Sequence, residues 1–212
     1  MVCRQCHGIE RFFDQREAEG KLKQYRNNGP RETTRVLIDA LKAEGIEGGT
    51  LLDIGGGIGA IQHEFLKAGA SSSIGVDAST AYIQAAEQEA QRQGHADRVR
   101  HHHGDFVEIA GNIQPADIVT LDRVICCYHD LDSLVGLSAQ RAGRLYGIIY
   151  PHDNWLLRTG FGAFNTYLRL RRNPFRIFVH PTAAVDGLLR RHGFLRRFYH
   201  KTLLWQVAVY GR

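Results

Sequence analysis

The run Leu51-Leu52-Asp53-Ile54-Gly55-Gly56-Gly57-Ile58-Gly59 decides the fold of this chain. An apolar strand leads into a cluster of glycines, and residues 58–68 continue with helical spacing. Glycines at this point permit a tight turn and let the backbone approach a ligand closely. The run therefore predicts the first strand, loop and helix of a site for a nucleotide-containing ligand, although a ligand-free surface turn remains an alternative.

Asp53 helps to identify the ligand. The spacing Gly55-x-Gly57-x-x-Ala60 fits a dinucleotide fingerprint, so the glycines alone do not separate NAD from S-adenosylmethionine. A carboxylate at the end of the strand would face the pyrophosphate of NAD and repel it. S-adenosylmethionine has no phosphate and carries an ammonium and a sulfonium group. Asp53 therefore favours S-adenosylmethionine as the cofactor.

A second acid ends the next apolar run, Ile74-Gly75-Val76-Asp77. It follows the glycine loop by about twenty residues, the place where a carboxylate grips a ribose diol in nucleotide-binding folds. Capping of the following helix, by Asp77 or by Ser79, is the alternative role. With the glycine loop ahead of it, we expect Asp77 to bind ribose.

The tetrad His103-Gly104-Asp105-Phe106 follows a third strand. Asp105 is suited to accept a hydrogen bond from an adenine amino group, and Phe106 offers apolar contact to the ring. His101, His102 and His103 alternate along the strand, so they cannot all share one face, and we interpret them as strand residues rather than metal ligands.

Strands and helices alternate along the chain. The expected strands are 50–54, 73–77, 98–103, 117–121 and 145–150, with helices over 58–68, 80–93 and 131–142. This order predicts an α/β fold with a doubly wound parallel sheet covered on both faces. A helix over 182–192 and two strand-like runs at 194–199 and 203–210 follow. The few residues between these runs fit an antiparallel hairpin.

We expect a single domain over 1–212 with two additions around the sheet. Residues 1–48 read as a helical cap, with a helical pattern from Gly8 to Lys23. Residues 152–180 form an insertion rich in aromatic side chains and arginines, and we expect both segments to cover the pocket. In the insertion, Phe161, Phe164 and Tyr167 either line the pocket or anchor the insertion to the core, and the sequence leaves this open.

The three motifs in this order resemble the class I S-adenosylmethionine-dependent methyltransferases, over roughly residues 30–212. That family has a Rossmann-like, seven-stranded sheet whose last strand is antiparallel. The resemblance implies that Asp53 and the glycine loop bind the methionine part, Asp77 the ribose and Asp105 the adenine. The cofactor-binding set implied in this way is Asp53, Gly55, Gly57, Gly59, Asp77, Ala78, Gly104, Asp105, Phe106 and Asp122.

A more distant similarity is to the magnesium-protoporphyrin O-methyltransferases. It rests on the segment around Tyr25, on Leu121-Asp122-Arg123-Val124-Ile125 and on Tyr128. That family has a histidine directly before the tyrosine. Here Cys127 stands in that place and His129 follows the tyrosine, a departure that counts against a porphyrin substrate.

Four residues are candidates for contact with the methyl acceptor. Tyr128 and His129 follow the fourth strand, at the sheet edge where ligands bind, and Tyr25 enters through the porphyrin-enzyme similarity. His152 follows the fifth strand and is a candidate general base oriented by Asp153, or a histidine of a surface loop. The adjacent cysteines Cys126 and Cys127 read as apolar packing rather than as nucleophiles.

Charge and cysteine usage restrict the remaining possibilities. The chain has a net charge of +5, with much of the excess in arginines after residue 168. These arginines are compatible with a solvated face, an anionic substrate or contact with an anionic membrane surface, and no nucleic-acid motif is present. Cys3-Arg4-Gln5-Cys6-His7 has the form of a haem attachment site, but no export signal and no second ligand pair accompany it. We expect no metal and a cytoplasmic location.

The sequence as a whole predicts transfer of a methyl group to a small, largely apolar acceptor that bears a carboxyl or hydroxyl group, with O-methylation favoured. Two alternatives are an NAD(P)-dependent oxidoreductase and a catalytically silent protein that binds S-adenosylmethionine. A monomer and a homodimer are both compatible with the sequence.

Overall fold

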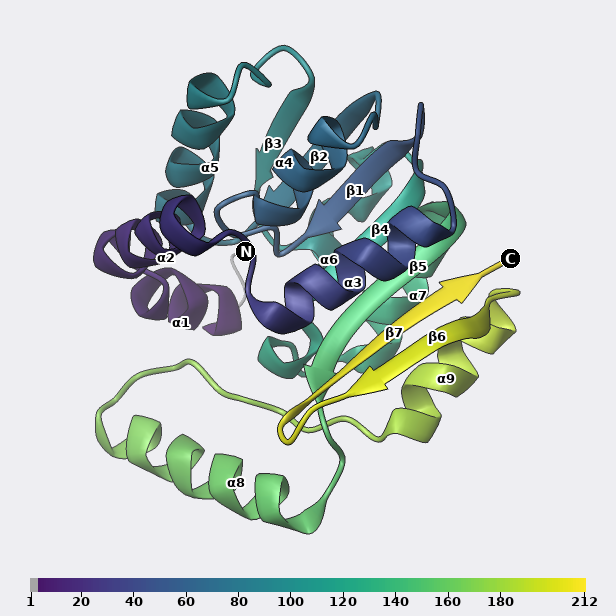
Figure 1. The fold of residues 1–212 in the computed structure, drawn as a ribbon. Helices are drawn as coiled ribbons and strands as arrows, with labels where there is room; N and C mark the ends of the chain where they lie inside the picture. Colours follow the sequence, from purple (N-terminus) through teal and green to yellow (C-terminus); the bar gives the residue numbers. More distant parts are fainter. Residues whose placement is uncertain (1–3) are drawn as a thin grey trace.

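The computed structural model describes residues 4–212, and their side chains from residue 8 onward. It contains one seven-stranded sheet of order β3-β2-β1-β4-β5-β7-β6 (Figure 1). The strands are β1 (Thr50–Ile54), β2 (Ser72–Asp77), β3 (Val99–His103), β4 (Ala116–Asp122), β5 (Ala142–Pro151), β6 (Leu195–Lys201) and β7 (Trp205–Gly211). Strands β1 to β5 are parallel, and β7 runs antiparallel to both β5 and β6. The predicted doubly wound sheet with a terminal antiparallel hairpin is confirmed.

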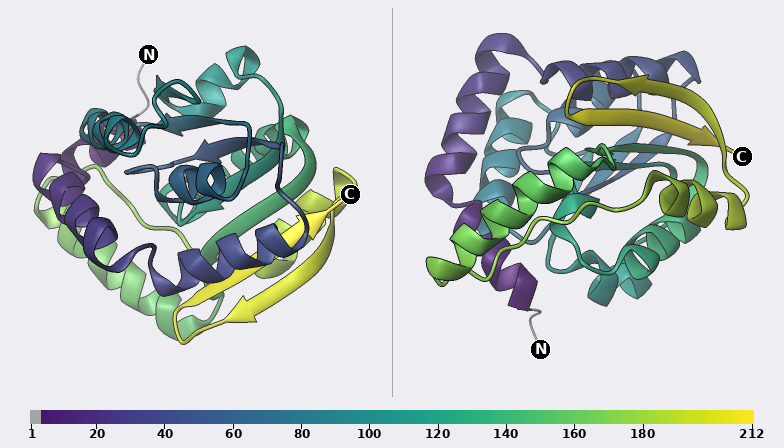
Figure 2. Two further views of the ribbon diagram at one scale, coloured as in Figure 1. Left: turned by 45° about the horizontal axis from the view of Figure 1, so that its top comes forward. Right: turned by 90° about the horizontal axis from the view of Figure 1, so that it is seen from below.

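Helices cover both faces of this sheet (Figures 1 and 2). One face carries α3 (Glu32–Ala43), α4 (Ala60–Lys67) and α5 (Thr80–Arg92), and the other carries α6 (Phe106–Ile109), α7 (Leu131–Arg141) and α9 (Thr182–Arg191). Side chains of the strands alternate between the two hydrophobic clusters, as the period of two requires: Leu51 packs with Leu37 on one face, and Leu52 packs with Tyr146 on the other.

The N-terminal cap is divided into two short helices before α3. These are α1 (Arg4–Phe12) and α2 (Gln15–Asn28), so the helical pattern from Gly8 to Lys23 is interrupted at residues 13 and 14. Asp14 begins α2 because its carboxylate accepts a hydrogen bond of 3.0 Å from the Glu17 amide. α1 and α2 lie beyond the carboxyl ends of the parallel strands, where they cover the edge at which ligands bind (Figure 1).

The insertion at 152–180 contains α8 (Trp155–Leu170), a helix that the sequence reading did not assign. Asn154 caps it, because its side chain accepts a hydrogen bond of 2.8 Å from the Leu157 amide. α8 stands away from the sheet, and the segment that follows it runs back along it (Figure 2).

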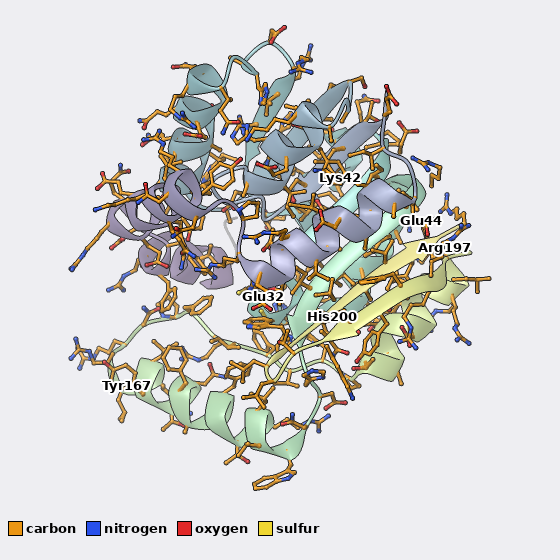
Figure 3. All side chains as sticks on the ribbon, viewed as in Figure 1. Glu32, Lys42, Glu44, Tyr167, Arg197 and His200 are labelled. Atoms are coloured by element: carbon orange, nitrogen blue, oxygen red, sulfur yellow. The ribbon has the colours of Figure 1, made fainter. Side chains whose placement is uncertain are left out.

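The terminal hairpin differs from the prediction at its turn. β7 begins at Trp205, so Leu203 and Leu204 belong to the turn rather than to the predicted strand 203–210. The Thr202 hydroxyl accepts from the Trp205 amide at 3.1 Å and closes the turn. At the other end of the hairpin, Arg197 of β6 donates to Glu44 at the end of α3 (3.2 Å), and these two side chains lie together in Figure 3. Among the described residues, every helix is too short or too polar to cross a bilayer.

Candidate cofactor and acceptor site

The glycine loop between β1 and α4 has a backbone that favours glycine. Gly55, Gly57 and Gly59 have φ angles of +63°, +54° and +77°, values that other residues adopt rarely. A Cβ atom at Gly55 would come within 2.5 Å of the Val124 side chain, and the Gly55 amide donates to the Val76 carbonyl at 2.7 Å. The loop is thus held against β2 and the segment after β4, with no room for a side chain at its first position.

Asp53 is a buried acid at the start of this loop. Its carboxylate accepts hydrogen bonds from the Thr120 hydroxyl at 2.7 Å and from the Gln62 amide at 3.2 Å. Burial is the main cause that raises the pKa of Asp53 to about 7, and these two hydrogen bonds only partly oppose it. No cation of the described residues forms an ion pair with Asp53, so the charged carboxylate fits a ligand that brings an ammonium group.

Asp77, at the end of β2, receives two backbone hydrogen bonds. The amides of Gly57 and Ser79 donate to its two carboxylate oxygens at 2.9 Å and 2.8 Å. The cap of α5 is Ser79 itself, because its hydroxyl accepts from the Tyr82 amide at 3.2 Å. Burial raises the pKa of Asp77 to about 6. Ser79, not Asp77, therefore caps α5. The Asp77 carboxylate lies beside the glycine loop, where its oxygens can accept hydrogen bonds from a diol.

Asp105 joins the end of β3 to the turn after β4. Its carboxylate accepts from the Val107 amide at 3.0 Å, which begins α6, and from the Tyr128 hydroxyl at 3.0 Å. His180 fixes the same turn by donating to the Tyr128 carbonyl at 2.8 Å. Tyr128 lines the cavity with its hydroxyl directed to the proposed adenine acid, whereas His129 is exposed, stacks on Tyr128 and does not line the cavity.

Asp122, at the end of β4, connects this edge of the sheet to the N-terminal cap. It accepts from the Thr34 hydroxyl at 2.6 Å and from the Arg123 guanidinium at 2.7 Å. Arg123 has a φ of +61°, a strained value for a residue other than glycine, and its guanidinium lies 4.9 Å from the centre of the Trp205 ring. Strained residues held by several partners are frequent at functional sites, and Arg123 lies where the order of strands reverses between β1 and β4.

These residues border one cavity of about 430 Å³. Asp53, Asp77, Asp105 and Asp122 line one end of it, together with Gly55, Gly57, Ala78, Gly104 and Phe106. Gly59, which the family resemblance places in the cofactor-binding set, does not line the cavity. Apolar residues of the cap, the insertion and the terminal hairpin also line the cavity, namely Ile9, Phe12, Phe13, Phe161, Phe175, Ile177 and Trp205. Helix α2 adds the polar side chains Glu17, Lys21 and Gln24. A cavity of this size, with a polar end and an aromatic end, is suited to a nucleotide-containing ligand beside a small apolar molecule.

The cap and the insertion meet over this cavity. The rings of Phe12 and Phe175 stack with their centres 4.5 Å apart, and the Phe13 ring packs against Phe175 at 5.6 Å. Gly8 permits this contact, because a Cβ atom there would lie 2.4 Å from the Phe175 backbone nitrogen. α1 and the segment after α8 therefore close the aromatic end together.

Replacing Gly8 with alanine should separate α1 from the insertion. The added methyl group overlaps backbone atoms that cannot move alone, so we expect the KM for the acceptor to rise several-fold. Gly20→Ala is the matched control, since a Cβ at Gly20 meets nothing within 4 Å. Steady-state kinetics of both variants would test this, and equal KM values would contradict the role given to the contact.

Two of the predicted acceptor residues have other partners. Tyr25 lines the cavity, but its hydroxyl donates to Glu64 at 2.9 Å, and burial raises the pKa of Tyr25. His152 does not line the cavity and donates to the Thr202 carbonyl at 2.9 Å. The predicted His152–Asp153 pair is not formed, because Asp153 accepts from Arg158 at 2.8 Å and β5 extends through Pro151 to carry His152 toward the hairpin turn.

Sequence reasoning missed the cations of the cavity. They are Lys21, Arg31 and Arg123, and none comes from the insertion. Lys21 pairs with Glu17 at 2.9 Å and Arg123 pairs with Asp122, while Arg31 has no carboxylate partner among the described residues. A single arginine before a helix gives no signal in the sequence, so only the folded arrangement identifies Arg31.

The cysteines and the possible metal ligands fall partly outside the described residues. The Cys3–His7 prediction falls on side chains outside the described part of the chain. Within the described part, no cluster of three or more His, Cys, Asp or Glu side chains is arranged to hold a metal ion. Cys126 is buried and Cys127 lines the cavity, with a pKa raised by its neighbour Cys126 and by burial, which suits packing rather than nucleophilic attack.

Asp77→Ala is expected to weaken binding of S-adenosylmethionine by about 10- to 100-fold, the effect of losing a charge-assisted hydrogen bond to the ribose. Asp97→Ala, at an exposed acid, is the control. Isothermal titration calorimetry of both variants measures the difference. Unchanged affinity in Asp77→Ala would remove this residue from the site.

Comparisons with known proteins agree with this geometry. A model of the O-methyltransferase domain matches residues 1–140. Ribosomal protein L11 methyltransferase from Enterobacter sp. (strain 638) is 30% identical over 117 residues, which make up 55% of this chain and 39% of that protein. The chain thus spans less than half the length of the curated relatives that it matches.

Solved structures show the same fold at low sequence identity. Magnesium protoporphyrin IX methyltransferase from Synechocystis PCC 6803, with bound SAH, superposes with a TM-score of 0.76 at 17% identity and covers 98% of this chain and 99% of that chain. An O-methyltransferase family protein from Burkholderia thailandensis has a TM-score of 0.69 at 18% identity, over 94% of this chain and 60% of that chain. These findings do not favour the nicotinamide-dependent alternative. The chain belongs to the O-methyltransferase domain family, within the class I S-adenosylmethionine-dependent methyltransferases.

Proposed function

We propose that this protein transfers a methyl group from S-adenosylmethionine to a carboxylate oxygen of a small, largely apolar acceptor. The observation that carries the proposal is the composition of the aromatic end of the cavity. Aromatic side chains line this end, Arg31 lines the same cavity, and no histidine is among the described residues of the lining. Such a site attracts an apolar anion and offers little for the deprotonation of a neutral acceptor.

The cofactor end of the cavity supports the assignment of the methyl donor. Asp53 is proposed to pair with the ammonium group, Asp77 with the ribose hydroxyls, and Asp105 with the adenine amino group. The positive φ angles of Gly55 and Gly57 let the backbone approach the methionine part closely. When bound there, S-adenosylmethionine would supply an electrophilic methyl group, which would pass to the acceptor oxygen as its bond to sulfur breaks and S-adenosylhomocysteine leaves.

The side chains around the aromatic end position the acceptor rather than remove a proton from it. A carboxylate is already deprotonated at neutral pH, so its methylation needs alignment and the exclusion of water. Tyr25 and Cys127 keep their protons, because the pKa of each is raised. Arg31 is at the N-terminus of α3, where the positive end of the helix dipole adds to its attraction for an anion.

The proposal is tested by methyl incorporation with matched compounds that share one aromatic skeleton and carry a carboxylic acid, an alcohol or an amide. We expect turnover with the acid and little with the other two. Turnover with the alcohol alone would replace the carboxylate proposal with hydroxyl methylation. Binding of S-adenosylmethionine without turnover of any compound would favour the catalytically silent alternative.

His152→Ala is expected to change the turnover number by less than about twofold and to leave its pH dependence unaltered, since His152 lies outside the cavity lining. The measurement is the turnover number against pH for wild type and variant. If the turnover number of the wild type changed sharply with pH near the pKa of histidine and that change disappeared in the variant, His152 would be the general base. This result would contradict the carboxylate proposal.

A further inference from the structure

α8 has apolar side chains on two opposite faces. Its inner face includes Leu168, which is buried, and Phe161, which lines the cavity. Its outer face consists of residues at helical spacing, all of them exposed: positions 155, 156, 159, 163, 166, 167 and 170. A surface helix normally has polar residues outward. Here Trp155 is 76% exposed and Leu170 is 80% exposed.

The turn between β6 and β7, beside the start of α8, carries two more exposed apolar side chains. Leu203 is 88% exposed and Leu204 is 49% exposed. His152 holds this turn beside the start of α8, since its amide donates to the Leu204 carbonyl at 3.1 Å and its ring to the Thr202 carbonyl. We define the apolar rim as the exposed large apolar residues of α8 and this turn, which are Trp155, Leu156, Tyr167, Leu170, Leu203 and Leu204.

The apolar rim is bordered by positive charge. No residue of the outer face of α8 is charged, and four exposed arginines adjoin it: Arg158, Arg169, Arg171 and Arg172. Between residues 152 and 180 the sequence contains one acid, Asp153, and it pairs with Arg158. Tyr167 lies in the last turn of α8, at the margin of the molecule (Figure 3), and Arg169, Arg171 and Arg172 follow it in the sequence.

We propose that the apolar rim and its arginines form a docking surface for an anionic lipid bilayer. Helices that lie in a membrane interface combine a leucine- and tryptophan-rich face with flanking basic residues, as α8 does. With 16 residues α8 is about 24 Å long, too short to span a bilayer, so it lies along the surface with the rim in the headgroup region and the arginines on lipid phosphates.

Charge also argues against a second copy of the chain as the occupant. A two-fold contact places the same patch of each copy against the other. The arginines around the rim would then face arginines, and the single acid of the insertion is already paired. An anionic bilayer instead complements both the apolar side chains and the arginines. This docking does not depend on which acceptor the enzyme methylates.

The test is sedimentation of the full chain with phosphatidylcholine vesicles and with mixed phosphatidylcholine–phosphatidylglycerol vesicles. We expect binding to the mixed vesicles and little to the neutral ones. The double variant Arg169→Glu/Arg171→Glu should lower vesicle affinity by at least about tenfold, because each basic residue near an anionic surface contributes to binding. Arg100→Glu, at an exposed arginine of β3, is the control for the change in charge.

The contribution of insertion is tested separately with Trp155→Ser and Leu203→Ser. Each should lower affinity for the mixed vesicles several-fold, while Leu195→Ser, at a residue 65% exposed on β6 away from the rim, should not. Absence of binding to the mixed vesicles at low salt would overturn the proposal. Equal affinity of wild type, Trp155→Ser and Leu203→Ser for the mixed vesicles would also overturn it. So would a dimer in sedimentation equilibrium that Trp155→Ser converts to a monomer.

Discussion

Asp53→Asn is expected to weaken binding of S-adenosylmethionine by about 100-fold, because it removes the buried carboxylate that is proposed to pair with the cofactor ammonium. Loss of one partner of a buried charge pair costs about 3 kcal/mol or more. The same substitution should stabilise the cofactor-free protein at neutral pH. An asparagine keeps the shape of the side chain without a charge to bury, and its oxygen accepts from the Thr120 hydroxyl. Its NH2 group donates to the Gln62 oxygen once the Gln62 amide turns over, since that oxygen has no partner in the wild type.

The pH dependence gives this prediction a sign that can be checked. The pKa of Asp53 is about 7 in the folded protein and near 3.8 when the chain is unfolded, so its ionisation opposes folding. Its contribution to the free energy of unfolding is fully present below pH 4 and is lost as the pH rises toward 7, at about 1.4 kcal/mol per pKa unit. The stabilisation by Asp53→Asn should therefore be absent at pH 4 and grow to a few kcal/mol at pH 7.

Cofactor binding should follow the opposite course. An ammonium ligand pairs with the ionised carboxylate, so wild-type affinity should fall as the pH drops below about 7, by up to about tenfold per unit. Asp53→Asn should lack that part of the dependence. Calorimetry and thermal unfolding of both proteins between pH 5 and pH 7.5 measure the two trends. A variant that is both less stable and unchanged in affinity would refute the role of Asp53.

Arg31→Leu is expected to lower kcat/KM for a carboxylate acceptor by about 100-fold, since the acceptor charge would lose its partner inside an apolar cavity. Affinity for S-adenosylmethionine should stay within about twofold of wild type, because the ammonium and ribose groups of the cofactor are assigned to Asp53 and Asp77. An equal loss of cofactor affinity would assign Arg31 to the cofactor instead. Arg31→Lys should restore part of the activity, as it keeps the charge without the bidentate geometry.

Arg169→Leu is the matched control for Arg31, because Arg169 is an exposed arginine of the insertion that does not line the cavity. We expect it to leave methyl transfer to a soluble acceptor unchanged. An equal loss in both variants, or no loss in Arg31→Leu, would show that Arg31 does not select the acceptor.

The position of the proposed cofactor residues at one edge of the sheet could be predicted from the sequence because it depends on local patterns. The glycine loop follows its strand directly, and Asp77 and Asp105 each end or follow an apolar strand, so parallel pairing brings them to one edge. The alternation of strands and helices also predicted the sheet and its antiparallel hairpin. Boundaries shifted by a few residues where turns intervene, as at Leu203 and Leu204.

The acceptor end was not readable because it is assembled from distant segments. Phe12, Phe175 and Trp205 come together only through the packing of the cap, the insertion and the hairpin. The sequence places arginines in the insertion, but those of α8 are exposed, and the cavity cation that lacks a carboxylate partner in the described part of the chain is Arg31. His152 and Asp153 are adjacent in the chain, yet each bonds to another partner because β5 directs them to opposite neighbours.

The measurement that tests the central claim most directly is the chemical stability of the transferred methyl group. The protein is incubated with S-adenosylmethionine labelled in its methyl group and an aromatic carboxylic acid, and the product is treated with alkali. The account predicts a methyl ester, whose label is released as methanol. A label that withstands alkali, as in an ether or a methylated amine, would contradict the account. So would the absence of label from every acid tested with protein that binds S-adenosylmethionine.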